Sequence, residues 1–336
     1  MTLPIILRTD AELNMGASVI DRIKEFGHLV TSENDDVQTL KAHVRDAELV
    51  FTCYAPISDE VIAAGTRLRG IVKYGVGVDS IDLEAATEHG IPVVHCPDYG
   101  TETVADHAFA LLIGVARKIA KIDRSMRSHG WLWPSTEYCG VDLAGKTIGL
   151  IGFGRIGRAM ARRANGFRMR QFVYDPYVAT SSANYEASRP EFRSLQDVIE
   201  NSDFLCLHCV LTPETNRIIG TNEFLRMKKS AILINVSRGN LVDEDALVEA
   251  LNNQRIAGAG LDVFVTEPIA TTHPLMNLDN VILTPHFAFY SREAYERLEC
   301  ECCDAMCDLM NGKLPSNIKN VEFPERVWYD KHHRTP

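Results

Sequence analysis

Short runs of apolar residues alternate with longer amphipathic stretches from the start of the chain. Apolar runs bounded by turn residues are typical of buried parallel strands, whereas apolar positions at three- and four-residue spacing indicate helices. The alternation predicts parallel sheets covered by helices on both faces. In the first part of the chain, we expect strands at Ile5–Arg8, Leu49–Cys53, Gly70–Tyr74 and Val93–His95, and helices at Ala17–Phe26, Asp82–His89 and Glu102–Ile122.

A second, denser series of the same pattern begins at Thr147. With 336 residues the chain is long enough for two domains. In this series we expect strands at Thr147–Gly152, Gln171–Asp175, Phe204–His208, Ala231–Val236, Gly258–Val263 and Val281–Thr284, helices at Arg155–Gly166, Leu195–Asn201, Glu244–Asn252 and Ser291–Met310, and a polar tail.

Charge and hydropathy exclude several functions. The formal net charge of −10 argues against a nucleic-acid partner, which needs a basic face, but it permits a small anionic substrate bound by local arginine and amide groups. The sequence has no apolar run long enough to span a bilayer, and its N-terminus lacks a basic leader region. We therefore expect a cytoplasmic protein with no membrane partner.

Cysteines are numerous but do not suggest a secreted disulfide framework, because nine is an odd number and they are scattered. Four of them, Cys300, Cys302, Cys303 and Cys307, lie close enough to suggest a metal site. Cys300, Cys303 and Cys307 also have the spacing of one buried helix face, where cysteine packs as a small apolar residue. We favour packing over ligation and expect no metal.

The sharpest motif is Gly-Phe-Gly-Arg-Ile-Gly at Gly152–Gly157. The pattern G-x-G-x-x-G is weak alone, because glycines also occur in ordinary turns without a ligand. Here it follows a predicted strand and opens a predicted helix, as in dinucleotide-binding folds. Gly152 permits the tight turn, Gly154 lets the backbone approach a pyrophosphate, and Gly157 lets helix and strand pack closely. The helix that opens with Arg155 and Ile156 offers its N-terminal N–H groups to the phosphates.

Asp175 closes the next predicted strand, at the spacing expected of an acid that binds the ribose. Its carboxylate should accept hydrogen bonds from the ribose hydroxyls and repel a 2′-phosphate. Pro176 and Tyr177 follow it, so no basic residue stands there to accept such a phosphate. The sequence therefore predicts NAD as the cofactor.

Several motifs, in this order and spacing, resemble the D-2-hydroxyacid dehydrogenase family, which includes phosphoglycerate and hydroxypyruvate dehydrogenases and the C-terminal binding proteins. They are Gly152–Gly157, Asn235–Gly239, Gly260–Phe264 leading to Glu267-Pro268, and Thr284–His286. The resemblance implies an α/β fold of two doubly wound parallel-sheet domains, with a Rossmann cofactor domain inserted in a flavodoxin-like substrate domain. We expect the cofactor domain at residues 100–285, and the substrate domain at residues 1–99 and 286–336, with a cleft between them.

The resemblance places the family's catalytic triad at Arg238, Glu267 and His286. Each residue also suits the chemistry. Arginine can hold the planar carboxylate and carbonyl of a 2-keto acid with its fork of donors. Histidine titrates near neutral pH and suits a proton donor, and a neighbouring carboxylate raises its pKa and fixes its orientation. We therefore expect hydride transfer between NAD and a small-molecule 2-keto or 2-hydroxy acid.

Further site residues follow from the same resemblance. Asp262 is expected to hold the nicotinamide carboxamide, although a strand-end cap is an equal alternative. Thr103 is expected near the cofactor phosphate, although it also suits a helix cap. Phe289 is expected to pack on the substrate side chain or to fill a domain interface. Also expected are Thr212 and Val236 at the cofactor, the amides of Val76 and Gly77 in a glycine-rich turn at the substrate carboxylate, and Tyr74 as a substrate contact.

Two other functions remain open on the sequence. The run Phe289-Tyr290-Ser291 resembles the C-terminal binding proteins, so an NAD-sensing corepressor-like protein is one alternative. A formate dehydrogenase relative is the other, but relatives that oxidise formate have an amide where this chain has Glu267. Trp131 and Trp133 lie in the region that relatives use for dimer contacts, so a homodimer is expected.

Overall fold

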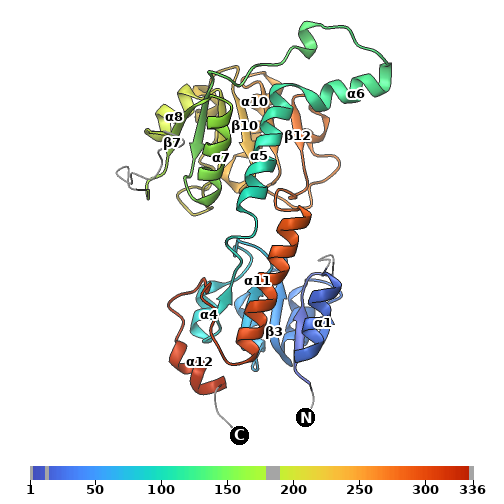
Figure 1. The fold of residues 1–336 in the computed structure, drawn as a ribbon, viewed down its shortest axis with the longest axis vertical. Coiled ribbons are helices and arrows are strands. Elements are labelled where there is room, and N and C mark those ends of the chain that lie inside the picture. The colour runs from blue at the N-terminus through green and yellow to red at the C-terminus, as the bar shows by residue number, and fades with distance from the viewer. Residues whose placement is uncertain (1–2, 12–14, 179–189, 333–336) are drawn as a thin grey trace. The chain divides into compact units, whose positions relative to one another are not determined.

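The computed structural model describes residues 3–11, 15–178 and 190–332. The chain forms two compact units, of which unit 1 comprises Met1–Gly100 and Ser291–Pro336 and unit 2 comprises Thr101–Tyr290. Each unit is built on its own parallel sheet with helices packed against it (Figure 1). The predicted fold class, a Rossmann domain inserted in a flavodoxin-like domain, is confirmed.

Unit 1 contains a five-stranded parallel sheet in the order β2-β1-β3-β4-β5. This is the doubly wound order of flavodoxin-like folds. Helices α2, α3 and α4 share a core on one face, whereas α1 and α11 pack together and against strands β2 and β4. The elements are β1 (Ile5–Arg8), α1 (Ala17–Phe26), β2 (His28–Thr31), α2 (Val37–Val44), β3 (Ala47–Thr52), α3 (Asp59–Ala64), β4 (Gly70–Lys73), α4 (Leu83–Glu88), β5 (Val93–Val94), α11 (Arg292–Met310) and α12 (Glu325–His332).

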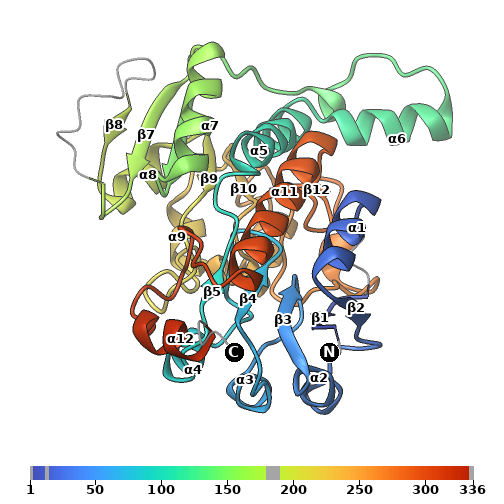
Figure 2. The same cartoon turned by 60° about the horizontal axis from the view of Figure 1, so that its bottom comes forward.

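Unit 2 contains a seven-stranded parallel sheet in the order β12-β11-β10-β9-β6-β7-β8, which is a Rossmann order with one added strand. Helices α5 and α7 cover one face (Figure 2), and α8, α9 and α10 cover the other. The elements are α5 (Thr101–Ala116), α6 (Ile119–His129), β6 (Thr147–Ile151), α7 (Arg155–Gly166), β7 (Arg170–Tyr174), β8 (Glu191–Phe192), α8 (Leu195–Asn201), β9 (Phe204–Leu207), α9 (Thr221–Arg226), β10 (Ile232–Asn235), α10 (Glu244–Asn252), β11 (Gly258–Leu261) and β12 (Val281–Leu283), with short 3-10 turns at Thr136–Tyr138, Gly239–Leu241 and Pro274–Asn277.

The central strands of unit 2 are apolar on both faces, which explains their near-continuous apolar runs. Every residue of β6 is buried; Ile148 and Leu150 join the core under α5 and α7, and Ile151 joins the core on the other face. Because the strands are parallel, the loops that follow β6, β7, β10, β11 and β12 all leave one edge of the sheet. The predicted catalytic and cofactor motifs lie on these loops.

The single helix predicted at Glu102–Ile122 is wrong, because the structure forms two helices there, α5 and α6. Lys118 lies between them in the left-handed region with φ of 54°. Ala116 is the last residue of α5, and its carbonyl accepts a hydrogen bond from the N–H of Val141, which lies in the loop after α6. No glycine or proline marks the break, so the local sequence did not signal it.

Two expectations for the C-terminal region also change. The expected polar tail contains α12, whose Trp328 is buried and donates a hydrogen bond from Nε1 to the Arg69 carbonyl at 2.6 Å. On α11 the buried cysteines are Cys302 and Cys303, whereas Cys300 is exposed, so the expected cysteine face was placed wrongly. Among the described residues, no three His, Cys, Asp or Glu side chains are grouped to hold a metal ion.

No helix within the described ranges combines the length and the apolar character needed to cross a membrane.

Candidate active site

The glycine motif forms a tight turn between β6 and α7. Gly152 has a φ of 94°, and a Cβ on it would lie 2.5 Å from the Cys209 nitrogen, so only glycine fits there. A Cβ on Gly157 would lie 2.3 Å from the Gly152 carbonyl oxygen, so this glycine lets the helix pack against the turn.

Gly154 differs, because a Cβ on it would meet no described atom within 4 Å. Packing within the chain therefore does not require glycine at this position. Gly154 is the N-cap of α7 and has no side chain to cap it, and Arg155 and Ile156 form the first turn. The open space beside Gly154 and the helix N-terminus fit the phosphates of a dinucleotide.

Asp175 lies beside this turn, directly after β7. Its Oδ2 accepts a hydrogen bond from the Phe153 N–H at 2.7 Å, inside the glycine motif, and its Oδ1 accepts one from the Tyr177 N–H at 2.9 Å. The carboxylate is half-buried. This places a negative charge next to the glycine turn, where the ribose of a dinucleotide is held in such folds.

His286 and Glu267 form a close pair on two loops of unit 2. The distance from His286 Nδ1 to Glu267 Oε2 is 2.7 Å, and about a third of each side chain is exposed. An ionised carboxylate can only accept, so His286 Nδ1 carries the hydrogen of this bond. Nε2 is then the ring nitrogen suited to proton transfer. Glu267 is itself held by the Phe264 N–H, which donates to Oε1 at 2.9 Å.

Opposing effects act on the pKa of the Glu267 carboxyl. Burial raises it, but the hydrogen bond and charge of His286 lower it, together with the Phe264 N–H and the charge of Arg238. The pKa of Glu267 therefore lies below its usual range, and the carboxylate stays ionised through the neutral and mildly acidic range.

Arg238 follows β10 on the neighbouring loop. A Cβ on the next residue, Gly239, would lie 2.0 Å from the backbone carbon of Phe264, so the Arg238 loop packs directly on the loop that carries Glu267. The Asn235 side chain donates a hydrogen bond to the Arg238 carbonyl at 2.8 Å and fixes the turn. The structure thus brings Arg238, Glu267 and His286 to one edge of one sheet.

Asp262 organises the turn that carries His286. Its buried carboxylate accepts hydrogen bonds from the Phe287 and Ala288 N–H groups at 2.9 and 2.8 Å, and its carbonyl accepts one from the His286 N–H at 2.8 Å. His286 adopts a φ of 56°, a conformation uncommon for residues other than glycine. Asp262 therefore positions the proposed acid, a role that the sequence analysis did not assign to it.

Three of the expected substrate residues belong to unit 1. Val76 is exposed and Gly77 half-buried in the loop after β4, and the Val76 carbonyl lies 3.0 Å from His95 Nδ1. Tyr74 is only 2% exposed and makes an edge contact with Phe51, with ring centroids 5.9 Å apart. Burial also raises the pKa of Tyr74. Tyr74 is a core residue, which corrects the expected side-chain contact with substrate.

The remaining expected residues lie in unit 2. Thr103 is in the first turn of α5, Val236 follows β10 and is almost buried, and the Thr212 N–H donates to the Thr215 hydroxyl at 2.7 Å. Phe289 is half-buried, and its ring lies 5.9 Å from that of Tyr290.

His208 is a residue at this edge that the sequence analysis did not single out. It follows β9, and its backbone carbon would lie 2.6 Å from a Cβ on Gly152. Its ring nitrogens are buried without hydrogen-bond partners among the described residues, and burial lowers its pKa to about 4. His208 is thus neutral at pH 7 and, unlike His286, has no carboxylate partner among the described residues. Its position at the end of the predicted strand Phe204–His208 was the available signal.

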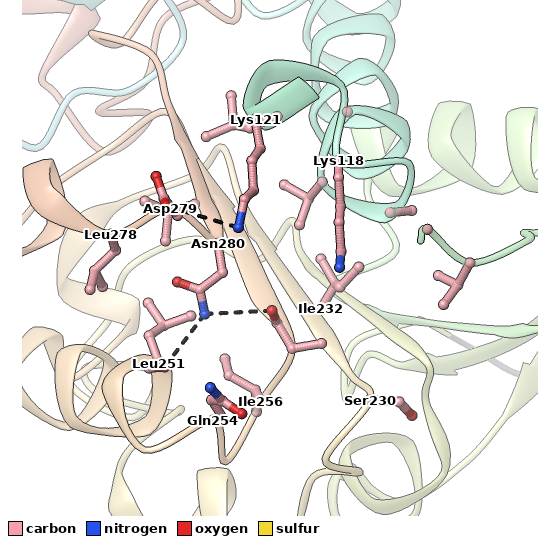
Figure 3. A pocket seen from close by; sticks show the side chains of 18 of the residues that line it. Lys118, Lys121, Ser230, Ile232, Leu251, Gln254, Ile256, Leu278, Asp279 and Asn280 are labelled. Atoms are coloured by element: carbon pink, nitrogen blue, oxygen red, sulfur yellow. Dashed lines mark hydrogen bonds and ion pairs between the residues drawn. The ribbon is translucent and has the colours of Figure 1, made fainter. Parts of the chain in front are cut away.

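A hollow of about 600 Å³ lies elsewhere in unit 2 (Figure 3). Its lining includes Ile232 and Val281, the first residues of β10 and β12, together with Lys118 and Lys121 at the base of α6. Because Arg238 and His286 follow the opposite ends of these strands, the hollow is at the other edge of the sheet and is not part of the candidate site.

Comparisons with known proteins agree with the motifs. The NAD-binding domain of the D-isomer specific 2-hydroxyacid dehydrogenases matches residues 109–288. The chain is 43% identical over 283 residues to a glyoxylate reductase from Korarchaeum cryptofilum, covering 83% of this chain and 84% of that one.

Two solved structures share the fold over most of their length. A D-lactate dehydrogenase from Aquifex aeolicus, complexed with NAD and lactic acid, has a TM-score of 0.82 at 29% identity and covers 91% of this chain and 96% of its own. An NADPH-dependent glyoxylate/hydroxypyruvate reductase from Sinorhizobium meliloti, complexed with NADP and malonate, has a TM-score of 0.85 at 29% identity and covers 96% and 98%. The resemblance inferred from the motifs is confirmed: the chain belongs to the D-isomer-specific 2-hydroxyacid dehydrogenase family.

Proposed function

We propose that the protein is an NAD-dependent dehydrogenase that interconverts a 2-keto acid and the D-2-hydroxy acid. The observation that carries this proposal is the His286–Glu267 pair, held at 2.7 Å against the Arg238 loop. This arrangement supplies a proton donor and an anion clamp at the sheet edge that also carries the glycine turn. The D configuration rests on family membership.

In reduction, the site residues bind the keto acid, stabilise the developing charge and donate the proton. Arg238 holds the carboxylate and the keto oxygen of the substrate with its planar fork and stabilises the negative charge that develops on that oxygen. Bound NADH supplies the hydride to C2. His286 gives the Nε2 proton to the oxygen, and Glu267 stabilises the imidazolium before transfer and fixes its orientation.

NAD is proposed over NADP because of the charge on Asp175. A carboxylate beside the glycine turn accepts hydrogen bonds from ribose hydroxyls and repels a 2′-phosphate. Relatives of this fold have been solved with either nucleotide, so the preference rests on this residue.

Changing Asp175 to asparagine tests the cofactor preference. Asparagine keeps an acceptor for the Phe153 N–H but removes the charge. The ratio of kcat/KM for NADH to that for NADPH is expected to fall at least about tenfold, since charged hydrogen bonds contribute about 1.5–3 kcal/mol. Steady-state kinetics with both nucleotides measure this ratio. The control is Asp203→Asn, because Asp203 precedes β9 and so lies at the opposite end of the strands from the glycine turn. An unchanged ratio would contradict the role of Asp175.

Changing Glu267 to glutamine is expected to lower kcat for reduction about 100-fold and to change its pH dependence. Wild-type Glu267 stays charged until the pH falls below its lowered pKa, so its support for the imidazolium persists from neutral to mildly acidic pH. Without that charge, the loss of rate should be largest at neutral and mildly acidic pH, where wild-type Glu267 is ionised, and should narrow as the pH falls below the lowered pKa of Glu267.

The matched control for Glu267 is Glu244→Gln. Glu244 also pairs with a histidine, His273, at 3.2 Å in the same unit. Its variant should keep the wild-type pH profile. A Glu267→Gln profile that superimposes on the wild type would remove Glu267 from the proton-transfer machinery.

A homodimer is proposed through the arm formed by α6 and the loop after it, which projects from the rest of unit 2 (Figure 1). No residue of α6 is buried, and Trp131 and Trp133 are 73% and 79% exposed. Two large exposed aromatic side chains on a projecting arm are typical of a protein interface. Light scattering should show Trp131→Ser/Trp133→Ser shifting from twice the chain mass towards 37.5 kDa; a wild-type monomer would contradict the proposal.

The proposed activity is tested by NADH oxidation against a panel of 2-keto acids. Glyoxylate and hydroxypyruvate come first because related enzymes are named for them, followed by branched, aromatic and dicarboxylic acids. We expect saturable turnover with at least one acid. Tight NADH binding without turnover on any acid would contradict the proposal and favour a nucleotide-sensing protein.

A further inference from the structure

His107 is a titratable residue beside the candidate site that the proposed reaction does not use. It lies on α5, and about a quarter of its side chain is exposed. Its Nε2 is 2.9 Å from the Thr284 hydroxyl and 3.6 Å from Asp262 Oδ1. The neighbouring residues Ala108, Leu111 and Leu112 face the core under this helix, whereas His107 reaches towards the loop that follows β12.

The hydrogen atoms in this group can be placed by what each atom can donate. Asp262 is fully buried, and its Oδ1 lies 2.5 Å from the Thr284 hydroxyl. An ionised carboxylate only accepts, so the hydroxyl donates its hydrogen to Asp262. The hydroxyl oxygen then accepts from His107, which therefore carries a hydrogen on Nε2. Hydrogen bonds are therefore donated from His107 to Thr284 and from Thr284 to Asp262.

This chain of hydrogen bonds ends at the group that holds the His286 turn. Asp262 binds the N–H groups of Phe287 and Ala288, and its carbonyl binds that of His286. The left-handed backbone of His286 is strained for a residue with a side chain, and such strain persists only where the surroundings hold it. Any rotation of the Asp262 carboxylate would therefore tilt the imidazole against Glu267.

We propose that His107 is a positioning residue for His286, an inference that rests on the proposed function. By donating to Thr284, it fixes the hydroxyl towards Asp262 and so holds the carboxylate in the rotamer that the turn requires. Small errors in orientation cost rate because the proton must be delivered along a defined line. His107 acts on the chemical step through Thr284 and Asp262 and does not touch the substrate.

The test uses His107→Leu, which removes the donor, and His107→Gln, whose Nε2 can donate from a similar position. Thr284→Val removes the hydroxyl with little change in shape. Both His107→Leu and Thr284→Val should lower kcat about tenfold, which corresponds to one neutral hydrogen bond. The KM for the keto acid and the Kd for NADH should stay within about twofold. His107→Gln should recover most of the rate.

The double variant His107→Leu/Thr284→Val should lose no more than either single variant, because both interrupt one chain. With NADH deuterated at C4, the kinetic isotope effect on kcat should rise in His107→Leu. A wild-type kcat in His107→Leu, additive losses in the double variant, or a raised NADH Kd with unchanged kcat would each overturn the proposal. The last result would make His107 a cofactor contact.

A measurement without turnover separates this proposal from the proposed function. Histidine labelled with ¹⁵N reports by NMR which ring nitrogen of His286 carries the hydrogen. In the wild type we expect the Nδ1–H form held by Glu267, and in His107→Leu a mixture of forms, even if no keto acid is reduced. Identical His286 spectra in the two proteins would overturn the proposal, whatever the activity.

Discussion

Replacing His286 with alanine is expected to lower kcat for keto-acid reduction between about 10² and 10⁴-fold, the usual contribution of a general acid. The imidazole is the proposed donor of the proton that the substrate oxygen needs, and Glu267 holds it at 2.7 Å. The nearby His208 cannot replace it, because burial lowers its pKa to about 4 and leaves it neutral. Binding of NADH, followed by fluorescence, should change by no more than a few-fold.

The matched control is His273→Ala in the same unit. His273 also pairs with a glutamate, Glu244, and a similar fraction of it is exposed. Its loss should leave kcat close to that of the wild type. If His286→Ala keeps more than a tenth of the wild-type kcat, or if both variants are impaired alike, the assignment of the acid to His286 fails.

The second large effect is expected when Arg238 is replaced with alanine. We expect kcat/KM for the keto acid to fall about 10² to 10³-fold, because two charged hydrogen bonds to the substrate are lost. KM should rise through the lost carboxylate contact, and kcat should fall through the lost stabilisation of the developing charge. Arg238→Lys keeps the charge but not the fork, so it should recover less than a tenth of the rate.

Two controls sharpen this prediction. Arg226→Ala removes an exposed arginine that pairs with Glu200 on α8, away from the site, and should leave the kinetics unchanged. Because Arg238 also lowers the pKa of Glu267, the pH profile of Arg238→Ala tests the coupling between the two loops. A variant with wild-type kcat/KM would show that another group binds the substrate carboxylate.

The sequence predicted the fold class well because both sheets are parallel and buried. Strands covered on two faces must be apolar along their length, as in β6, so the pattern records them clearly. The sequence pattern failed for elements whose presence or ends depend on tertiary contacts. The break between α5 and α6 has no local marker, and α12 is a short, mostly polar helix with one buried side chain, Trp328.

The family resemblance named Arg238, Glu267 and His286 as candidates, but it did not show how they are arranged. The structure brings the three residues to one edge of one sheet. Tyr74 was misplaced, because strand alternation alone did not show that its ring packs on Phe51. The part played by Asp262 could not be predicted either, since it depends on how a turn 25 and 26 residues further along the chain folds around its carboxylate.

The proposed function requires direct hydride transfer from NADH to C2 of a keto acid, with the D-hydroxy acid as product. NADH carrying deuterium at the transferred C4 position tests this most directly, with the product analysed by mass spectrometry and chiral chromatography. We expect one deuterium at C2 of the D enantiomer, formed by the wild type and formed at least about 100-fold more slowly by His286→Ala. A hydroxy acid without deuterium at C2, the L enantiomer, or no product from any keto acid would contradict it.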